Sequence, residues 1–284
     1  MSINKKKNTE RKYFFPKYFS YSQLLKYQGQ ILYIPKDESN QNFIPCFFKK
    51  SKESSSNFLI AFHGNGENIF EYEYIVNYLC NELKMNIIVM EYKGYSCYIG
   101  DVDSDSILDD SLYVYDYIKK IFGINDKNIF IFGRSMGSAP AVYLSSKRNP
   151  NSTFLISAFE SIKNIGKGFD EELFEDIFRS IDIIYQVKSP ILFIHGKKDN
   201  LITWENSKNL YDKCNSEKKK LVLIDDMTHN YFDLEKHIVF QIIEFFKDKN
   251  IEIDEKNNVI DFENQNIKKL FIIPSELIKQ LKKQ

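Results

Sequence analysis

The feature that most constrains this chain is the stretch Gly133-Arg-Ser-Met-Gly137, which directly follows the apolar run Asn128-Ile-Phe-Ile-Phe132. A β-branched and aromatic run followed by Gly-x-Ser-x-Gly predicts a strand that enters a sharp turn before a helix. The flanking glycines let that helix pass close to the strand, where a Cβ would clash. The start of the helix, expected at Ser138, directs unpaired N–H groups toward the serine hydroxyl. The pattern predicts a nucleophile at Ser135, although such short motifs also occur by chance in loops.

The composition is that of a folded enzyme. With 284 residues, of which 43% are hydrophobic, the chain can bury a sizeable core, and its net charge of zero does not indicate nucleic-acid binding. No apolar run reaches the roughly 18 residues that a membrane span needs, and the N-terminus does not resemble a signal peptide. The cysteines show neither metal-like nor disulfide-framework spacing, which predicts reduced thiols in an intracellular, cytoplasmic protein: Cys46, Cys80, Cys97 and Cys214. We expect no metal and no cofactor.

Apolar runs alternate with amphipathic segments along most of the chain. We expect strands at 31–34, 43–49, 58–62, 86–91, 128–132, 153–156, 191–195 and 221–224, and helices at about 69–83, 104–121, 138–147, 203–214 and 233–248. This alternation predicts an α/β fold with a mostly parallel central sheet flanked by helices on both faces. In such sheets ligand-binding groups gather at the carboxyl ends of the strands.

Three regions are distinguished along the chain. Residues 1–28 are basic and aromatic, 29–249 form the main domain, and 250–284 form a C-terminal extension. The N-terminal segment either makes weak peripheral contact with an anionic membrane or packs its aromatic side chains on the domain. The extension, with a strand-like piece at 258–262 and a basic helical end, either packs as an extra element or stays mobile.

An acid and a histidine follow Ser135 in the chain, each after a further expected strand. Asp199 lies in the turn after the strand at 191–195, and His229 lies in the loop after the strand at 221–224. A serine hydroxyl becomes a good nucleophile when an imidazole accepts its proton, and a carboxylate fixes the tautomer of that imidazole. The order serine, acid, histidine is the one expected of an α/β-hydrolase arrangement.

Some alternatives to this assignment remain. Asp225 and Asp226 compete with Asp199 because they are near His229 in sequence, whereas Asp199 follows a separate strand. The other histidines occupy a turn, a position before a glycine and a helix, where structural roles are favoured: His63, His195 and His237.

Two backbone N–H groups are candidates for an oxyanion hole. One is that of Met136, which follows the nucleophile, and the other is that of Asn65 in the turn His63-Gly-Asn-Gly66. The small residues of this turn allow the backbone to approach a substrate.

These pieces together resemble the α/β-hydrolase superfamily, and most of all its compact branch of serine-aminopeptidase-like hydrolases and protein depalmitoylases. The matching pieces span about 56–248 and are 62–68, 91–95, 129–137, 189–199 and 227–230. The resemblance implies a cofactor-free serine hydrolase that cleaves an acyl ester or thioester through an acyl-enzyme. An acylated protein is one of the substrates that the resemblance allows. It implies Ser135 as nucleophile, His229 as base, Asp199 as orienting acid, and Asn65 and Met136 in the oxyanion hole.

The chain departs from that branch in two places. Depalmitoylases of this kind carry an N-terminal cysteine cluster, but the first cysteine here is Cys46, inside the domain. The region where a lid is often inserted, 157–188, is short, which predicts a small lid or none. One helix is expected there at about 170–184, either as an apolar cap over an acyl group or as the core face of a packing helix: Phe169, Leu173, Phe174, Ile177 and Phe178.

Two other functions remain open. One is an aminopeptidase-like or small-ester hydrolase with the same triad, and the other is a non-catalytic scaffold with a hydrolase fold.

Overall fold

The structure is a computed structural model that describes residues 11–17, 19–37, 42–165, 176–253 and 260–282. Within them one eight-stranded sheet has the order β1-β2-β4-β3-β5-β6-β7-β8; β2 pairs antiparallel with β1 and with β4, and all other neighbouring strands pair parallel. The strands are β1 (Ile31–Pro35), β2 (Phe43–Lys49), β3 (Phe58–Phe62), β4 (Asn86–Met90), β5 (Ile129–Arg134), β6 (Ser152–Ile156), β7 (Ile191–Gly196) and β8 (Lys219–Ile224). The predicted α/β fold with a mostly parallel sheet is confirmed.

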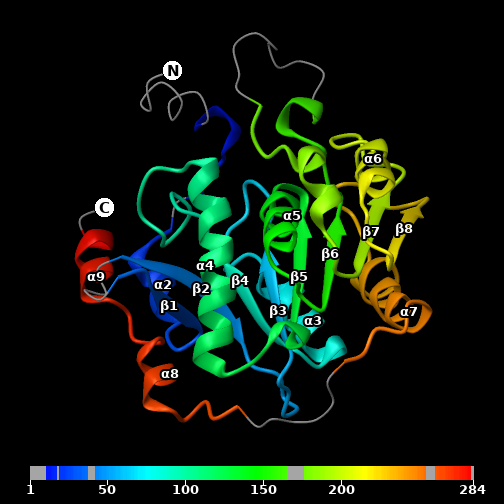
Figure 1. Cartoon of the computed structure of the whole chain (residues 1–284). Helices are drawn as coiled ribbons and strands as arrows, with labels where there is room; N and C mark the ends of the chain where they lie inside the picture. Colours follow the sequence, from blue (N-terminus) through cyan, green and yellow to red (C-terminus); the bar gives the residue numbers. More distant parts are fainter. Residues whose placement is uncertain (1–10, 18, 38–41, 166–175, 254–259, 283–284) are drawn as a thin grey trace.

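Helices cover both faces of this sheet (Figure 1). They are α2 (Tyr21–Lys26), α3 (Glu73–Leu83), α4 (Ser104–Phe122), α5 (Ser138–Lys147), α6 (Glu205–Lys213), α7 (Phe240–Asp248), α8 (Gln265–Lys269) and α9 (Ser275–Leu281). Buried side chains of α4, α5 and α6 share one apolar cluster, and those of α3 and α7 share the other. The central strands β3, β4 and β6 are buried along their whole length, as expected for a sheet that is covered on both sides.

Short helical turns complete the described chain. They are η1 (Arg11–Tyr13), η2 (Asp126–Asn128), η3 (Ser135–Gly137), η4 (Ile162–Asn164), η5 (Ser180–Asp182), η6 (Ile184–Gln186) and the π-helical turn η7 (Leu234–Val239).

The helix expected at 170–184 is wrong in its described part. Residues 176–179 are irregular, Phe178 has a φ of +54°, and only the short turns η5 and η6 follow. A left-handed residue interrupts an α-helix, so the apolar spacing here reflects side chains buried from an irregular segment. Ile177 and Phe178 are buried, while Phe169, Leu173 and Phe174 lie outside the described residues.

The C-terminal extension packs on the edge of the sheet. The N–H of Tyr33 in β1 donates to the carbonyl of Leu270 at 2.7 Å, which occupies part of the open edge of that strand. Ile267 and Leu270 join one apolar cluster and Leu277 and Leu281 the other, so the extension wraps around the edge. The described residues 260–262 of the expected strand at 258–262 form no strand.

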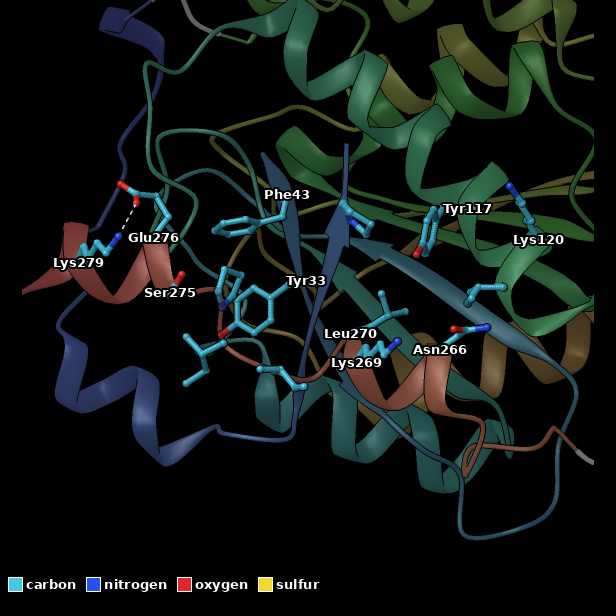
Figure 2. A pocket seen from close by; sticks show the side chains of 15 residues that line it. Tyr33, Phe43, Tyr117, Lys120, Asn266, Lys269, Leu270, Ser275, Glu276 and Lys279 are labelled. Atoms are coloured by element: carbon cyan, nitrogen blue, oxygen red, sulfur yellow. Dashed lines mark ion pairs between the residues drawn. The ribbon is translucent and has the colours of Figure 1, made fainter. Parts of the chain in front are cut away.

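A cleft of about 870 Å³ lies between β1, α4 and these C-terminal helices (Figure 2). Its lining includes Tyr33, Tyr117 and Lys269 and none of the predicted catalytic residues. This cleft is a consequence of how the extension crosses the sheet edge.

The described part of the N-terminal segment packs on the domain. Tyr13, Phe14 and Phe19 are buried, and the ring of Phe19 stacks on that of Phe70 at 4.0 Å. Phe15 remains 62% exposed. None of the helices in the described ranges is long and apolar enough to cross a membrane.

Candidate active site

The turn after β5 holds Ser135 in a left-handed backbone conformation, with a φ of +53°. This conformation costs a non-glycine residue about 1–3 kcal/mol, and such strain is found mainly at functional sites. The two glycines of the motif allow this sharp turn because they lack a Cβ where other backbone atoms lie close. A Cβ on Gly133 would lie 2.4 Å from the carbonyl oxygen of Gly137, and one on Gly137 would lie 2.1 Å from that of Phe62. The sequence therefore folds locally into the sharp turn that the motif predicts.

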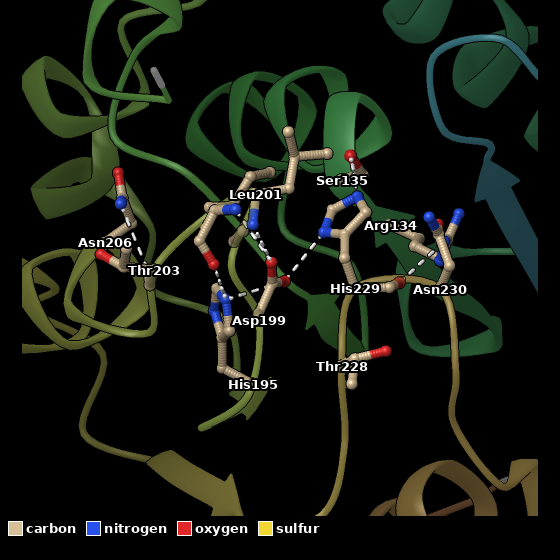
Figure 3. Close-up of polar contacts among 12 residues, drawn as sticks. Arg134, Ser135, His195, Asp199, Leu201, Thr203, Asn206, Thr228, His229 and Asn230 are labelled. Atoms are coloured by element: carbon tan, nitrogen blue, oxygen red, sulfur yellow. Dashed lines mark hydrogen bonds and ion pairs between the residues drawn. The ribbon is translucent and has the colours of Figure 1, made fainter. Parts of the chain in front are cut away.

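The structure brings Ser135, His229 and Asp199 together at the carboxyl ends of β5, β8 and β7 (Figure 3). His229 Nε2 lies 3.0 Å from Ser135 Oγ, and His229 Nδ1 lies 2.8 Å from Asp199 Oδ2. The carboxylate can only accept at neutral pH, so Nδ1 carries a proton and Nε2 is free to accept the serine proton. The arrangement can therefore activate the hydroxyl.

Asp199 is buried and held in its charged form. Burial would raise the pKa of this carboxyl, but the imidazoles of His195 and His229 and the N–H of Ile202 hold the pKa well below its ordinary value. Asp199 Oδ1 also accepts from the N–H groups of Leu201 and Ile202, at 3.0 and 2.8 Å. The turn thus presents a fixed carboxylate to His229.

The competing acids make other contacts. Asp225 pairs with Lys197 at 2.7 Å, and Asp226 lies 3.3 Å from His237. Both carboxylates are largely exposed, and it is Asp199 that contacts His229.

The turn at 63–66 is clamped through the side chain of Asn65. Its Nδ2 donates to the carbonyl of Tyr13 at 2.6 Å, and its Oδ1 accepts from the N–H of Phe15 at 3.0 Å and the hydroxyl of Tyr95 at 2.7 Å. The N-terminal segment therefore lies directly against this turn. The backbone N–H of Asn65 donates no hydrogen bond to another described residue, which leaves it available.

His63 forms a buried ion pair under the same turn. Its Nε2 lies 2.9 Å from Glu91 Oε1 and its Nδ1 lies 2.9 Å from the carbonyl of Gly64. Both neighbours are acceptors, an arrangement that favours the imidazolium form, in which both ring nitrogens donate. Burial lowers the pKa of His63, but the hydrogen bond and the charge of Glu91 outweigh it and raise the pKa. His63 has a structural position, as its place in the sequence predicts.

Sequence reasoning gave no role to two charged residues beside the triad. Arg134 and Glu67 form an ion pair at 2.7 Å between the turn at 63–66 and the His229 loop. The sequence offered one signal for Arg134: a charged residue stands at the end of an apolar strand, directly before the serine of the motif. Within the described ranges, no group of three His, Cys, Asp or Glu side chains is arranged to hold a metal ion.

Fold and sequence similarity together place the chain in the α/β-hydrolase superfamily. Among solved structures, the fold is similar to Est1E from Butyrivibrio proteoclasticus, with a TM-score of 0.62, 19% identity, and coverage of 78% of this chain and 100% of that one. It is also similar to an esterase of Pyrococcus furiosus, with a TM-score of 0.62, 18% identity, and coverage of 77% and 91%. These likenesses show the fold.

Sequence relatives give the same superfamily. An α/β hydrolase of Acanthamoeba polyphaga mimivirus is 29% identical over 83% of this chain and 91% of its own length. Human alpha/beta hydrolase domain-containing protein 17B is 25% identical over 62% of each chain, so the match spans less than two thirds of that protein. The serine aminopeptidase family model matches residues 171–237. The comparisons support a hydrolase.

Proposed function

We propose that this chain is a serine hydrolase that cleaves acyl esters or thioesters through an acyl-enzyme intermediate. The observation that carries the proposal is the hydrogen-bonded chain from Ser135 Oγ through His229 to Asp199, with contacts of 3.0 and 2.8 Å. These distances lie within the range over which a base takes a proton from a nucleophile.

In the proposed reaction Ser135 Oγ attacks the carbonyl carbon while His229 Nε2 takes its proton. The N–H groups of Asn65 and Met136 would stabilise the oxyanion that forms. His229 then gives the proton to the departing alcohol or thiol as the carbonyl–leaving-group bond breaks. Water, activated by His229, attacks the acyl-enzyme, and the carboxylic acid leaves Ser135 free.

An apolar pair beside the turn at 63–66 favours an acyl substrate. Phe14 lies between two residues that hydrogen bond the Asn65 side chain, and its ring packs edge-on against that of Phe178 at 6.0 Å. Both rings are buried, so the segment that clamps the proposed oxyanion turn is backed by apolar side chains. We include protein thioesters, and with them protein depalmitoylation, among the proposed substrates because the short stretch at 157–188 leaves little room for a large lid, which suits a single acyl chain.

The two alternatives make different demands on the site. A non-catalytic scaffold does not require the serine and histidine to be in contact, and the 3.0 Å distance speaks against it. An aminopeptidase-like reaction uses the same triad, and the match of residues 171–237 to the serine aminopeptidase family model keeps it as the second candidate.

A fluorophosphonate probe tests the nucleophile. We expect the full chain to be labelled at Ser135, and Ser135→Ala to lose both labelling and turnover. Ser157→Ala is the matched control because Ser157 follows the neighbouring strand β6, is buried, and has an Oγ without a partner in the described structure. A folded chain that is not labelled would overturn the proposal.

A substrate panel tests the reaction class. Acyl-CoA thioesters, p-nitrophenyl esters of increasing chain length and aminoacyl anilides would be compared by kcat/KM. We expect esters and thioesters to exceed anilides by at least tenfold. Preferential cleavage of anilides would support the aminopeptidase alternative.

We further propose only weak, peripheral contact with membranes. Two cations of the N-terminal segment are already paired, Arg11 with Asp101 and Lys17 with Glu71, which reduces their attraction to anionic lipid. Flotation with vesicles that contain phosphatidylserine should recover little protein at 150 mM salt, which is about physiological ionic strength. Tight, salt-resistant binding would contradict this.

A further inference from the structure

Arg134 occupies the variable position before the nucleophile, yet its guanidinium is almost fully buried, with 6% of the side chain exposed. Its Nη1 donates to Glu67 Oε1 at 2.7 Å. Its Nη2 donates to the carbonyl of His229 at 3.0 Å and to Asn230 Oδ1 at 3.2 Å (Figure 3). A single side chain of the serine turn therefore holds the backbone of the proposed base.

Glu67 connects the same guanidinium to the turn at 63–66. While Oε1 accepts from Arg134, Oε2 accepts from the N–H of Gly64 at 2.7 Å. The packing is tight, because a Cβ on Gly64 would lie 2.9 Å from Glu67 Oε2 and 3.0 Å from Arg134 Nη1. The ion pair thus rests directly on the backbone of the turn.

The surroundings strengthen these contacts. The ring of Phe232, in the His229 loop, lies 5.3 Å from Arg134 Cζ and covers the guanidinium. Hydrogen bonds between charged groups are stronger in a water-poor environment, and a planar guanidinium can serve two partners in fixed directions. The result is a rigid bridge between three loops.

We propose that Arg134 and Glu67 are positioning residues that set the oxyanion turn and His229 in register with Ser135. This proposal rests on the proposed function. The two residues act through others: Glu67 fixes Gly64, next to Asn65, and Arg134 fixes the backbone of His229. A displacement of about 1 Å between reacting groups can reduce a rate about 100-fold, so a bridge of this kind matters for kcat more than for substrate binding.

Arginine is needed for its shape as well as its charge. Lysine has a point charge on a flexible stem and lacks a planar fork that reaches a carboxylate on one side and a carbonyl on the other. Arg134→Lys should therefore break the bridge although it keeps the positive charge. Glu67→Gln replaces one of the two carboxylate oxygens by an NH2 group, which would face a donor, either the N–H of Gly64 or the guanidinium of Arg134.

The experiment compares Arg134→Lys and Glu67→Gln with wild type in the full chain. We expect kcat to fall 10- to 100-fold with KM within about twofold, and the affinity for a boronic-acid transition-state analogue to weaken in proportion to kcat. Arg148→Gln is the matched control, because Arg148 forms a two-pronged pair with Asp116 at 2.9 and 2.6 Å on the surface, and its kcat should be unchanged.

A second measurement does not depend on turnover. Hydrogen exchange of peptides that cover 63–66 and 228–232 should accelerate in both variants and stay unchanged in Arg148→Gln. Glu67, with 28% of its side chain exposed, gives a milder variant if Arg134→Lys does not fold. Unchanged exchange, or a kcat within twofold of wild type in a folded variant, overturns the positioning role. If exchange is faster in the variants but the probe does not label the wild-type chain, the proposed function is overturned instead.

Discussion

The Nε2 atom of His195 lies 3.4 Å from Oδ2 of Asp199, so a second buried imidazole contacts the acid that orients His229. The same Nε2 lies 2.9 Å from the carbonyl of Ile202, and Nδ1 lies 2.6 Å from Ser207 Oγ. Since Nε2 faces acceptors, it carries a proton and donates to the carbonyl of Ile202. Ser207 Oγ, beside Nδ1, also lies 3.3 Å from the carbonyl of Ala158. His195 thus ties the acid turn to its surroundings and places a buried imidazole next to the carboxylate of Asp199.

Replacement of His195 by alanine should lower the free energy of unfolding by about 2–4 kcal/mol. The variant loses the hydrogen bonds to the Ile202 carbonyl and to Ser207 and leaves a cavity among buried atoms. Urea unfolding at pH 7 measures the change. Ser207→Ala removes the hydroxyl that contacts Nδ1 and the carbonyl of Ala158, keeps the imidazole, and should cost about 1 kcal/mol. Equal losses in the two variants would contradict a stabilising role of the contacts that His195 Nε2 makes.

A second prediction concerns the strained backbone of Ser135. Ser135→Gly and Ser135→Ala both remove the nucleophile, but only glycine relieves the left-handed conformation at a φ of +53°. That conformation costs alanine about 1–2 kcal/mol, and the greater entropy of unfolded glycine offsets part of the gain. Ser135→Gly should therefore exceed Ser135→Ala in stability by about 0.5–1 kcal/mol. Thermal unfolding of the two variants, with Ser157→Ala and Ser157→Gly as a second left-handed pair at a φ of +49°, measures this.

The fold could be predicted largely because its signals are local. Strand β3 and helix α5 begin and end at the residues that the apolar pattern gives, 58–62 and 138–147. The final helix was expected from 233, but it opens with the π-helical turn η7, and α7 starts at Phe240. The extra backbone residue of such a turn has no signature in apolar spacing. At 176–184 the apolar spacing is that of a helix, but it does not reveal the left-handed backbone of Phe178, which interrupts one.

The candidate site likewise has one part that the sequence predicts and one part that it does not. Ser135, Asp199 and His229 could be placed together because each follows a strand of one parallel sheet, and strand ends meet at one edge. Their catalytic role stays a prediction. The bridge made by Arg134 and Glu67 could not be predicted, since it depends on side chains 67 residues apart that only the folded loops bring within 2.7 Å.

The buried pair of His63 and Glu91 predicts a loss of stability on the alkaline side. The pKa of His63 is raised in the folded state, so its contribution is fully present below the unfolded value of about 6.5 and is lost as the pH rises through the folded pKa. Deprotonation would leave one ring nitrogen facing an acceptor without a hydrogen. The free energy of unfolding should therefore fall between about pH 6.5 and the folded pKa.

Urea unfolding between pH 6 and 9 measures this dependence. The neutral double variant His63→Gln with Glu91→Gln should lose the part of the slope that belongs to this pair, whereas His237→Gln, which changes a histidine paired with the exposed Asp226, should keep it. A slope that is the same in wild type and the double variant would show that His63 is not charged in the folded protein.

The final prediction concerns the clamp between Asn65 and the N-terminal segment. Asn65→Asp keeps an acceptor for the N–H of Phe15 and the hydroxyl of Tyr95, but it replaces the donor that faces the carbonyl of Tyr13 at 2.6 Å with a lone pair. The repulsion should free the segment without unfolding the domain. Trypsin cleavage after Lys12 and Lys17 should accelerate by about tenfold, equivalent to about 1.4 kcal/mol of local stability. The exposed Asn149→Asp serves as the charge-matched control and should be cleaved at the wild-type rate. Equal cleavage of all three proteins would mean that Asn65 does not hold the segment.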